Sequence, residues 1–385
     1  MKNGLTNKFT REEQFFIRVL KNFIHEEATE SDPSLDWKLI KEYADRHQVS
    51  AIFYKQTKNE IFQGSYAFQL YHYQKVNQII ASLKEQLKDC DFIIIKGMTL
   101  AELYPTPALR SMGDIDILIH AEDRKKIHSL LLNGGFTFKG ECIVSELKYE
   151  KMGYALEVHD SLVHRTFGKE ELVAYFMQAW GYVKDGRLDW SFHLIYLIEH
   201  LRQHFIGDGA GFRQFMDIAF VCEKGNVDWK FISEELKKIG LYEFAARVFA
   251  FLESWFEISI PFEKKELSEE FYYKACKKIF ADGVFGFDNE ENLGTAVARR
   301  MYNQKIGAKR AKLKYLLGCA FPPRRHMLRR SYCFYLQKHR FLLPVAWIHR
   351  FFYRIGNKKS RNFIKTQLVN ETIKERLKLL KAWGL

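Results

Sequence analysis

Residues 92–119 read FIIIKGMTLAELYPTPALRSMGDIDILI, and this stretch decides the fold of the chain. An apolar run at Phe92–Ile95 is followed by a Lys-Gly turn, a short segment of helical spacing and a second apolar run that begins with Asp114 and Asp116. Side chains alternate across a strand, so the two aspartates project from one face while Ile115, Ile117 and Ile119 pack inward. The stretch predicts a strand, a turn, a short helix and an acidic strand.

Two carboxylates on one strand face can share divalent cations. Mg2+ prefers oxygen ligands and is commonly held by one or two carboxylates together with substrate phosphates. We expect the pair to be exposed, with neither sulfur nor imidazole beside it, which favours Mg2+ over Zn2+. An Asp-x-Asp pair alone is frequent in proteins without such chemistry, so the interpretation depends on the surrounding parts.

The surrounding motifs carry a family resemblance. In chain order they are Lys96-Gly97, Tyr104-Pro105-Thr106-Pro107, Arg110, Gly113-Asp114-Ile115-Asp116, Ala155-Leu156-Glu157-Val158-His159 and Phe212-Arg213-Gln214-Phe215-Met216-Asp217. This order resembles the DNA polymerase beta-type nucleotidyltransferase superfamily, and most closely its uncharacterised bacterial branch. Segments 321–323 and 342–344 are also similar to that branch, so the resemblance covers most of the chain.

The resemblance implies two-metal phosphoryl chemistry, in which paired ions roughly 3.5–4 Å apart stabilise the attacking and leaving oxygens. Asp114 and Asp116 would bridge Mg2+ or Mn2+ ions. Glu157 would be the third carboxylate, holding the catalytic ion and helping to deprotonate the acceptor hydroxyl. Asp160 is the competing third acid, and we favour Glu157 because it shares a strand face with Ala155 and His159.

Phosphate binding is expected from Lys96, Gly97, Arg110 and Arg213. The wider superfamily has Gly-Ser at the turn, whereas this chain has Gly97-Met98, so backbone amides and Lys96 would have to hold the triphosphate. Arg110 can neutralise phosphate charge through its planar fork, or can form a surface ion pair.

The helical module after the core supplies second-tier candidates. His204, Arg213 and Asp217 belong to this group, although Arg213 and Asp217 can equally form a plain i, i+4 ion pair. His200 and His204 are also spaced i, i+4 and could hold a metal, but their apolar neighbours favour a core helix with polar inner contacts. His159 could orient a carboxylate or be a structural histidine.

The organisation predicted from the periodicity is α+β, with a small mixed sheet and helical segments before and after it. The expected parts are an N-terminal helical segment at 1–87, a nucleotidyltransferase α/β core at 88–167, a helical domain at 168–300 and a basic, aromatic-rich region at 301–385. With 385 residues and 47% hydrophobic residues, the chain can bury a substantial core.

Neither a signal pattern nor an apolar run of about 20 residues is present, which predicts a cytoplasmic protein. Six scattered cysteines, without a Cys-x-x-Cys pair, indicate neither a zinc site nor a disulfide framework.

Residues 301–385 contain 21 of the 60 Lys and Arg residues but two of the 47 Asp and Glu residues. This region therefore has a net charge of +19, whereas the rest of the chain has a net charge of −6. Interleaved aromatics allow a groove for RNA or DNA, or a surface for anionic lipid. The spacing of Trp347, Phe351 and Phe352 favours peripheral attachment to the membrane. A solvated basic face packed on the acidic body of the enzyme, or an acceptor site, is the alternative.

The function that fits best is transfer of a nucleoside monophosphate from an NTP to a hydroxyl acceptor. Three alternatives are a catalytically weak nucleotide- or polyanion-binding protein of the same fold, a metal-dependent glycosyltransferase and an interaction protein that acts through its basic region. The acceptor and the choice of NTP depend on pocket shape, which no local motif encodes.

Overall fold

The computed structural model describes residues 8–141, 146–163, 170–206, 209–263 and 265–284, and, in the C-terminal part, 310, 313, 317, 321–322, 324–327, 335–336, 339–355 and 378–385. The chain forms two compact units, Met1–Asp288 with Trp383–Leu385, and Asn289–Ala382. The first unit is a mixed α+β structure, and the predicted fold class is confirmed.

Four helices precede the sheet. They are α1 (Arg11–Ile24), α2 (Trp37–Arg46), α3 (Ser50–Thr57) and α4 (Gln63–Gln86). A capping box between Thr10 and Glu13 starts α1, and the Asp36 carboxylate caps α2 by accepting from two backbone amides. Helices α2 and α3 are separate because Gln48 adopts φ 58° between them.

The sheet has five strands in the order β1-β2-β5-β4-β3. Their bounds are β1 (Phe92–Ile95), β2 (Asp114–Ile119), β3 (Thr137–Glu141), β4 (Leu147–Lys151) and β5 (Tyr154–His159). The pair β2–β5 is parallel, and the other pairs are antiparallel. The short α5 (Gly97–Ala101) follows β1, and α6 (Arg124–Asn133) links β2 to β3.

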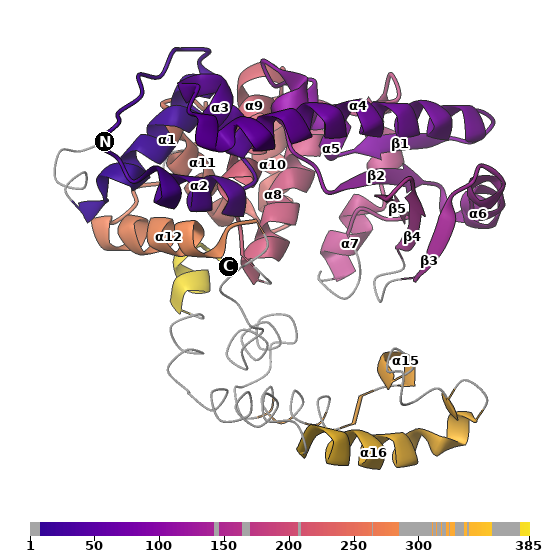
Figure 1. The fold of residues 1–385 in the computed structure, drawn as a ribbon. Helices are drawn as coiled ribbons and strands as arrows, with labels where there is room; N and C mark the ends of the chain where they lie inside the picture. Colours follow the sequence, from indigo (N-terminus) through magenta and orange to yellow (C-terminus); the bar gives the residue numbers. More distant parts are fainter. Residues whose placement is uncertain are drawn as a thin grey trace. The chain divides into compact units, whose positions relative to one another are not determined.

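One face of the sheet is apolar and the other carries the polar groups. Inward residues of β2, β4 and β5 form a core with Val76, Ile79 and Leu83 of α4 and with Ile127 and Leu131 of α6. Figure 1 shows α4 running along the sheet and α6 near β3 at its edge. The opposite face of β2 and β5 carries Asp114, Asp116 and Glu157, as the alternation of side chains requires.

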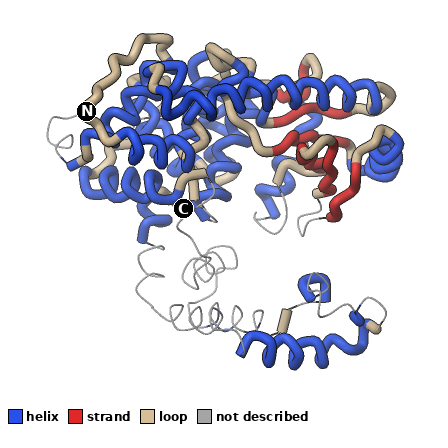
Figure 2. The backbone as a smooth tube through the Cα atoms, viewed as in Figure 1, coloured by secondary structure: helices blue, strands red, loops and turns tan. Residues whose placement is uncertain are grey.

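A helical body follows the sheet. It contains α7 (Glu170–Phe176), the hairpin strands β6 (Val183–Lys184) and β7 (Arg187–Leu188), α8 (Trp190–Ile206), α9 (Phe212–Lys224), α10 (Trp229–Lys238), α11 (Tyr242–Phe256) and α12 (Glu269–Asp282). In Figure 2 the strands gather at one side of this unit, and helices make up the rest. Helix α8 packs on both α9 and α10, so the body carries its own core.

The second unit contains α15 (Arg324–Met327), a 3-10 turn at Arg340–Leu342 and α16 (Leu343–Ile355). Met327, Leu336 and Ala346 form a small buried cluster in it. In the part of the chain that the structure describes, no helix is both long and apolar enough to cross a bilayer. Cys90, Cys222 and Cys276 are free, and the other three cysteines lie outside the described residues.

Candidate active site

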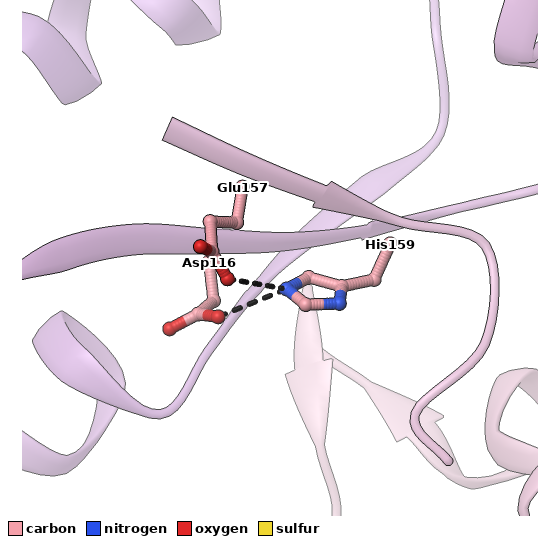
Figure 3. A group of neighbouring side chains, drawn as sticks. All are labelled: Asp116, Glu157 and His159. Carbon is pink, nitrogen blue, oxygen red and sulfur yellow. Dashed lines mark hydrogen bonds and ion pairs between the residues drawn. The ribbon is translucent and has the colours of Figure 1, made fainter. Parts of the chain in front are cut away.

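The parallel pairing of β2 with β5 brings the predicted acids together. Asp116 stands directly opposite Glu157, and Asp114, two residues earlier, stands opposite Ala155 on the same face. His159 follows on β5, and its Nε2 lies 2.9 Å from Asp116 Oδ1 and 3.9 Å from Glu157 Oε2 (Figure 3). One ligand atom from each of Asp116, Glu157 and His159 lies within 4.8 Å of the others. This donor set fits a divalent cation.

Two premises of the Mg2+ argument are wrong. Asp116 is 3% exposed rather than open to solvent, because β1 and β5 flank β2 on both sides and α8 covers its polar face. An imidazole also stands beside the pair, because period-two alternation on β5 puts His159 on the same face as Glu157. A mixed oxygen and nitrogen set accepts Mn2+ as readily as Mg2+.

Lys96 lies at the centre of the site. Its Nζ is 2.7 Å from Asp116 Oδ1, so the predicted Lys-Gly turn delivers its cation directly to the acidic pair. The Lys96 backbone has φ 56° and ψ −124°, a conformation that costs a residue other than glycine about 1–3 kcal/mol. The surrounding structure therefore holds this lysine in place against local strain.

The surroundings of the two aspartates shift their pKa values in opposite directions. Burial and the neighbouring Asp116 charge raise the pKa of Asp114. Burial also opposes ionisation of Asp116, but Lys96 and His159 outweigh it and hold the pKa of Asp116 below its ordinary value. The pair thus concentrates its fixed negative charge on Asp116, while Asp114 forms no ion pair with any described residue.

The structure separates the two candidates for third acid. Glu157 points to the Asp116 side and forms an ion pair with Lys148, its neighbour on β4. Asp160 forms an ion pair with Arg124 at 2.7 Å, and it does not line the cavity described next. The positions favour Glu157.

A cavity of about 260 Å3 opens over the polar face of the sheet. Its acidic wall comes from the sheet and the loop before β4: Asp114, Asp116, Glu146 and Glu157. It is also lined by the cations Lys96, Arg110 and Arg213 and by His200, Gln203 and His204 of α8. A cavity lined by both acids and cations can take a metal ion and an anionic ligand together.

Arg110 is buried rather than part of a surface ion pair. Its Nε and Nη2 donate to the two carboxylate oxygens of Asp217 at 3.1 and 2.8 Å, and the Tyr104 hydroxyl donates to Asp217 at 2.8 Å. Asp217 therefore pairs with Arg110 and not with Arg213, one turn away on α9. The remaining Nη1 of Arg110 lies 3.7 Å from where a Cβ on Gly97 would stand, so it faces the turn.

Arg213 keeps part of its hydrogen-bonding capacity. Its Nη1 donates to the backbone oxygen of Ser111 at 3.1 Å, while its buried Nε has no partner among the described residues. Burial and the nearby Arg110 charge lower the pKa of Arg213. An anion in the cavity would offset both costs.

His200 and His204 face each other with their Nε2 atoms 3.2 Å apart. Burial and the Lys96 charge lower the pKa of both, to about 4 for His204, so both imidazoles are neutral near pH 7. No acidic ligand joins them in a metal group within the described part of the chain.

Four further residues of the site were not predicted. Lys148 pairs with Glu157, Glu146 lies 3.7 Å from His159, and Tyr196 and Gln203 line the cavity from α8. The apolar-polar alternation in Leu147-Lys148-Tyr149-Glu150 is typical of a strand, and it could have predicted that Lys148 lies on one. The other three depend on how distant segments pack, which no local pattern encodes.

The model of one protein family, described as uncharacterised nucleotidyltransferase, matches residues 33–257, more than half of the chain. The matched segment includes all five strands of the sheet, together with α8 and α9. No curated protein and no solved structure matches the chain at a significant level.

Proposed function

The chain belongs to this family of nucleotidyltransferases, and from this premise we propose that it transfers a nucleoside monophosphate from an NTP to a hydroxyl acceptor. The observation that carries the proposal is the β2–β5 register, which places Glu157 opposite Asp116 beneath a cavity with Lys96 at its centre. A third acid on the strand next to an Asp-x-Asp pair supports nucleotidyl transfer over the glycosyltransferase alternative.

We propose that Asp114, Asp116 and Glu157 hold the divalent cations, with His159 beside them. Bound Mg2+ or Mn2+ would supply charge stabilisation for the attacking and leaving oxygens. The pKa of Asp114 is raised, and Asp116 stands directly opposite Glu157 in the strand ladder. Both observations are expected for a cluster of carboxylates that lacks sufficient positive charge.

The cations that line the cavity would bind the triphosphate. Lys96 lies beside Asp116, Arg110 presents Nη1 toward the Gly97 turn, and Arg213 has an Nε that bonds to none of the described residues. Arginine forks match phosphate oxygens in geometry and charge. These three residues would orient the NTP and stabilise charge that develops on it, while Glu157 would accept the proton of the attacking hydroxyl.

Lys96 also replaces the function that a turn serine has in the wider superfamily. Its strained backbone is maintained at a cost in free energy, which argues against a degenerate site. This observation supports an active enzyme over a catalytically weak relative.

The proposal is tested by pyrophosphate release from each of the four NTPs with Mg2+ or Mn2+, using a cell extract as the source of acceptor. The Asp114→Asn/Asp116→Asn double variant is the control for hydrolases in the extract. Release by the wild type above that of the variant is expected with at least one donor. Equal release by both proteins with every donor and both metals would contradict the proposal.

A further inference from the structure

The second unit exposes an unusual amount of apolar surface. Thirteen large hydrophobic side chains are exposed among the described residues, and six of them lie in this unit, which supplies far fewer described residues than the first. They are Leu313, Leu317, Phe321, Phe341, Val345 and Ile348. Single exposed apolar side chains are ordinary, but a concentration of them in one segment marks an interaction surface.

Helix α16 shows how this surface arises. Its inner face packs Ala346, Leu343 and Trp347 against the small cluster of the unit. Its outer positions carry Val345 and Ile348, which are 51% and 59% exposed and stand three residues apart, so they share a face. The helix is thus apolar on two faces, and the core of its own unit accounts for one of them.

Charge indicates the kind of partner. Residues 289–382 contain 23 Lys and Arg residues but four Asp and Glu residues. Apolar side chains at the surface of a strongly basic segment match an anionic membrane surface, where aliphatic groups enter the headgroup region and basic groups meet the phosphates.

The exposed groups favour lipid over nucleic acid. Non-specific binding of single strands depends on aromatic faces on which bases stack, whereas four of the six exposed side chains are aliphatic: Leu313, Leu317, Val345 and Ile348. Trp347 is partly buried and packs against the small cluster of the unit. Its indole N–H donates to the Pro322 oxygen at 2.8 Å, and its ring packs against Phe321. The side chains of Phe351 and Phe352 lie outside the described residues.

We propose that residues 289–382 form a module that attaches the enzyme peripherally to an anionic lipid surface, with Phe341, Val345 and Ile348 as the inserting side chains. The attachment is independent of the catalytic cavity, because none of these residues lines it. It would hold the enzyme where acceptors at a membrane surface are concentrated.

The test is co-sedimentation of the full-length protein, without nucleotide, with vesicles of phosphatidylcholine alone or of phosphatidylcholine mixed with phosphatidylglycerol. We expect binding to the mixed vesicles alone, weakened by salt. Val345→Asn/Ile348→Asn should weaken binding on the order of 100-fold, because two partly exposed aliphatic groups lose their burial in lipid.

A matched control removes exposed apolar groups from the first unit. Ile61→Asn/Met177→Asn changes side chains that are 39% and 64% exposed there, and it should leave vesicle binding unchanged. Circular dichroism confirms that both double variants are folded. Unchanged binding of Val345→Asn/Ile348→Asn, equal loss in the control, or tighter binding to single-stranded RNA than to mixed vesicles would each overturn the proposal.

Discussion

Glu157 stands directly opposite Asp116 in the β2–β5 ladder, whereas Asp160, three residues later, turns away to Arg124. Glu157→Gln should therefore reduce nucleotidyl transfer on the order of 1,000-fold, because it removes a carboxylate from the metal and proton-transfer site. NTP affinity should change much less. The measurement is pyrophosphate release together with the Kd of a labelled NTP.

Asp160→Asn is the matched control, since it removes a neighbouring carboxylate from the same chain segment but not from the cavity. It should keep near wild-type turnover. If Asp160→Asn lost activity while Glu157→Gln kept it, the assignment of the third acid would be reversed.

Asp114 and Asp116 should give opposite changes in stability when metal is removed. Asp114→Asn should raise the free energy of unfolding by about 1 kcal/mol, because the raised pKa of Asp114 shows that its charge is unfavourable in the folded state. Asp116→Asn should lower it by about 3–5 kcal/mol, because buried Lys96 loses its partner. Urea unfolding in the presence of EDTA measures both.

Both variants should lose metal-dependent transfer. The Asp114→Asn protein should therefore be more stable than the wild type but inactive. A destabilised Asp114→Asn protein would show that this carboxylate is favourably placed without metal, and the electrostatic description of the site would be wrong.

Arg110 and Asp217 connect the loop before β2 to α9 through a pair of side chains that are each about 95% buried. Asp217→Asn should lower stability by about 3 kcal/mol and raise the KM for the NTP, because the guanidinium loses the carboxylate that orients its Nη1. Steady-state kinetics at saturating metal separates KM from kcat.

Glu199→Gln is the control for stability loss alone. Glu199 forms a buried ion pair with Arg202 on α8 but does not line the cavity. It should destabilise the protein without changing KM. Equal effects of both variants on KM would show that the Arg110–Asp217 pair acts through stability only.

The parts of this site that the sequence predicts are those that depend on residues close together in the chain. The bounds of β1 were predicted to the residue, because it is a short apolar run that ends at the Lys-Gly turn. The shared face of Asp114 and Asp116 followed from strand alternation. The pairing of Asp217 did not, because the helical i, i+4 rule favours Arg213, whereas the folded chain brings Arg110 from 107 residues away.

The contribution of α8 to the cavity was the part of the site that the sequence predicted least. Tyr196 and Gln203 sit on a helix whose apolar residues surround it on all sides, so periodicity does not show which face meets the cavity. The break at Gln48 was also not predicted, because a positive φ at a residue other than glycine is imposed by packing.

His159 should influence the choice of metal. An imidazole beside carboxylates shifts preference from Mg2+ toward Mn2+. His159→Asn should therefore weaken activation by Mn2+ on the order of tenfold while changing activation by Mg2+ less. His128→Asn is the control, since His128 bonds to the Tyr149 hydroxyl and does not line the cavity. An unchanged ratio of the two metals would remove His159 from the metal site.

His193 should make stability depend on pH. It is fully buried on α8, neither ring nitrogen has a hydrogen-bond partner among the described residues, and burial lowers its pKa to about 3. The unfolded chain takes up this proton below its ordinary pKa of 6.5, before the folded protein does. The folded state is therefore favoured above pH 6.5, and stability falls by about 1.4 kcal/mol per pH unit as pH drops from there toward 3.

His193→Phe should relieve this dependence. Phenylalanine keeps the aromatic packing on Trp190, whose ring centroid is 5.5 Å from that of His193, and carries no titratable group. Urea unfolding at about pH 7 and about pH 5.5 should show that the variant loses about 1 kcal/mol less stability than the wild type between the two. The same loss in both proteins would mean that His193 is protonated equally in the folded and unfolded states.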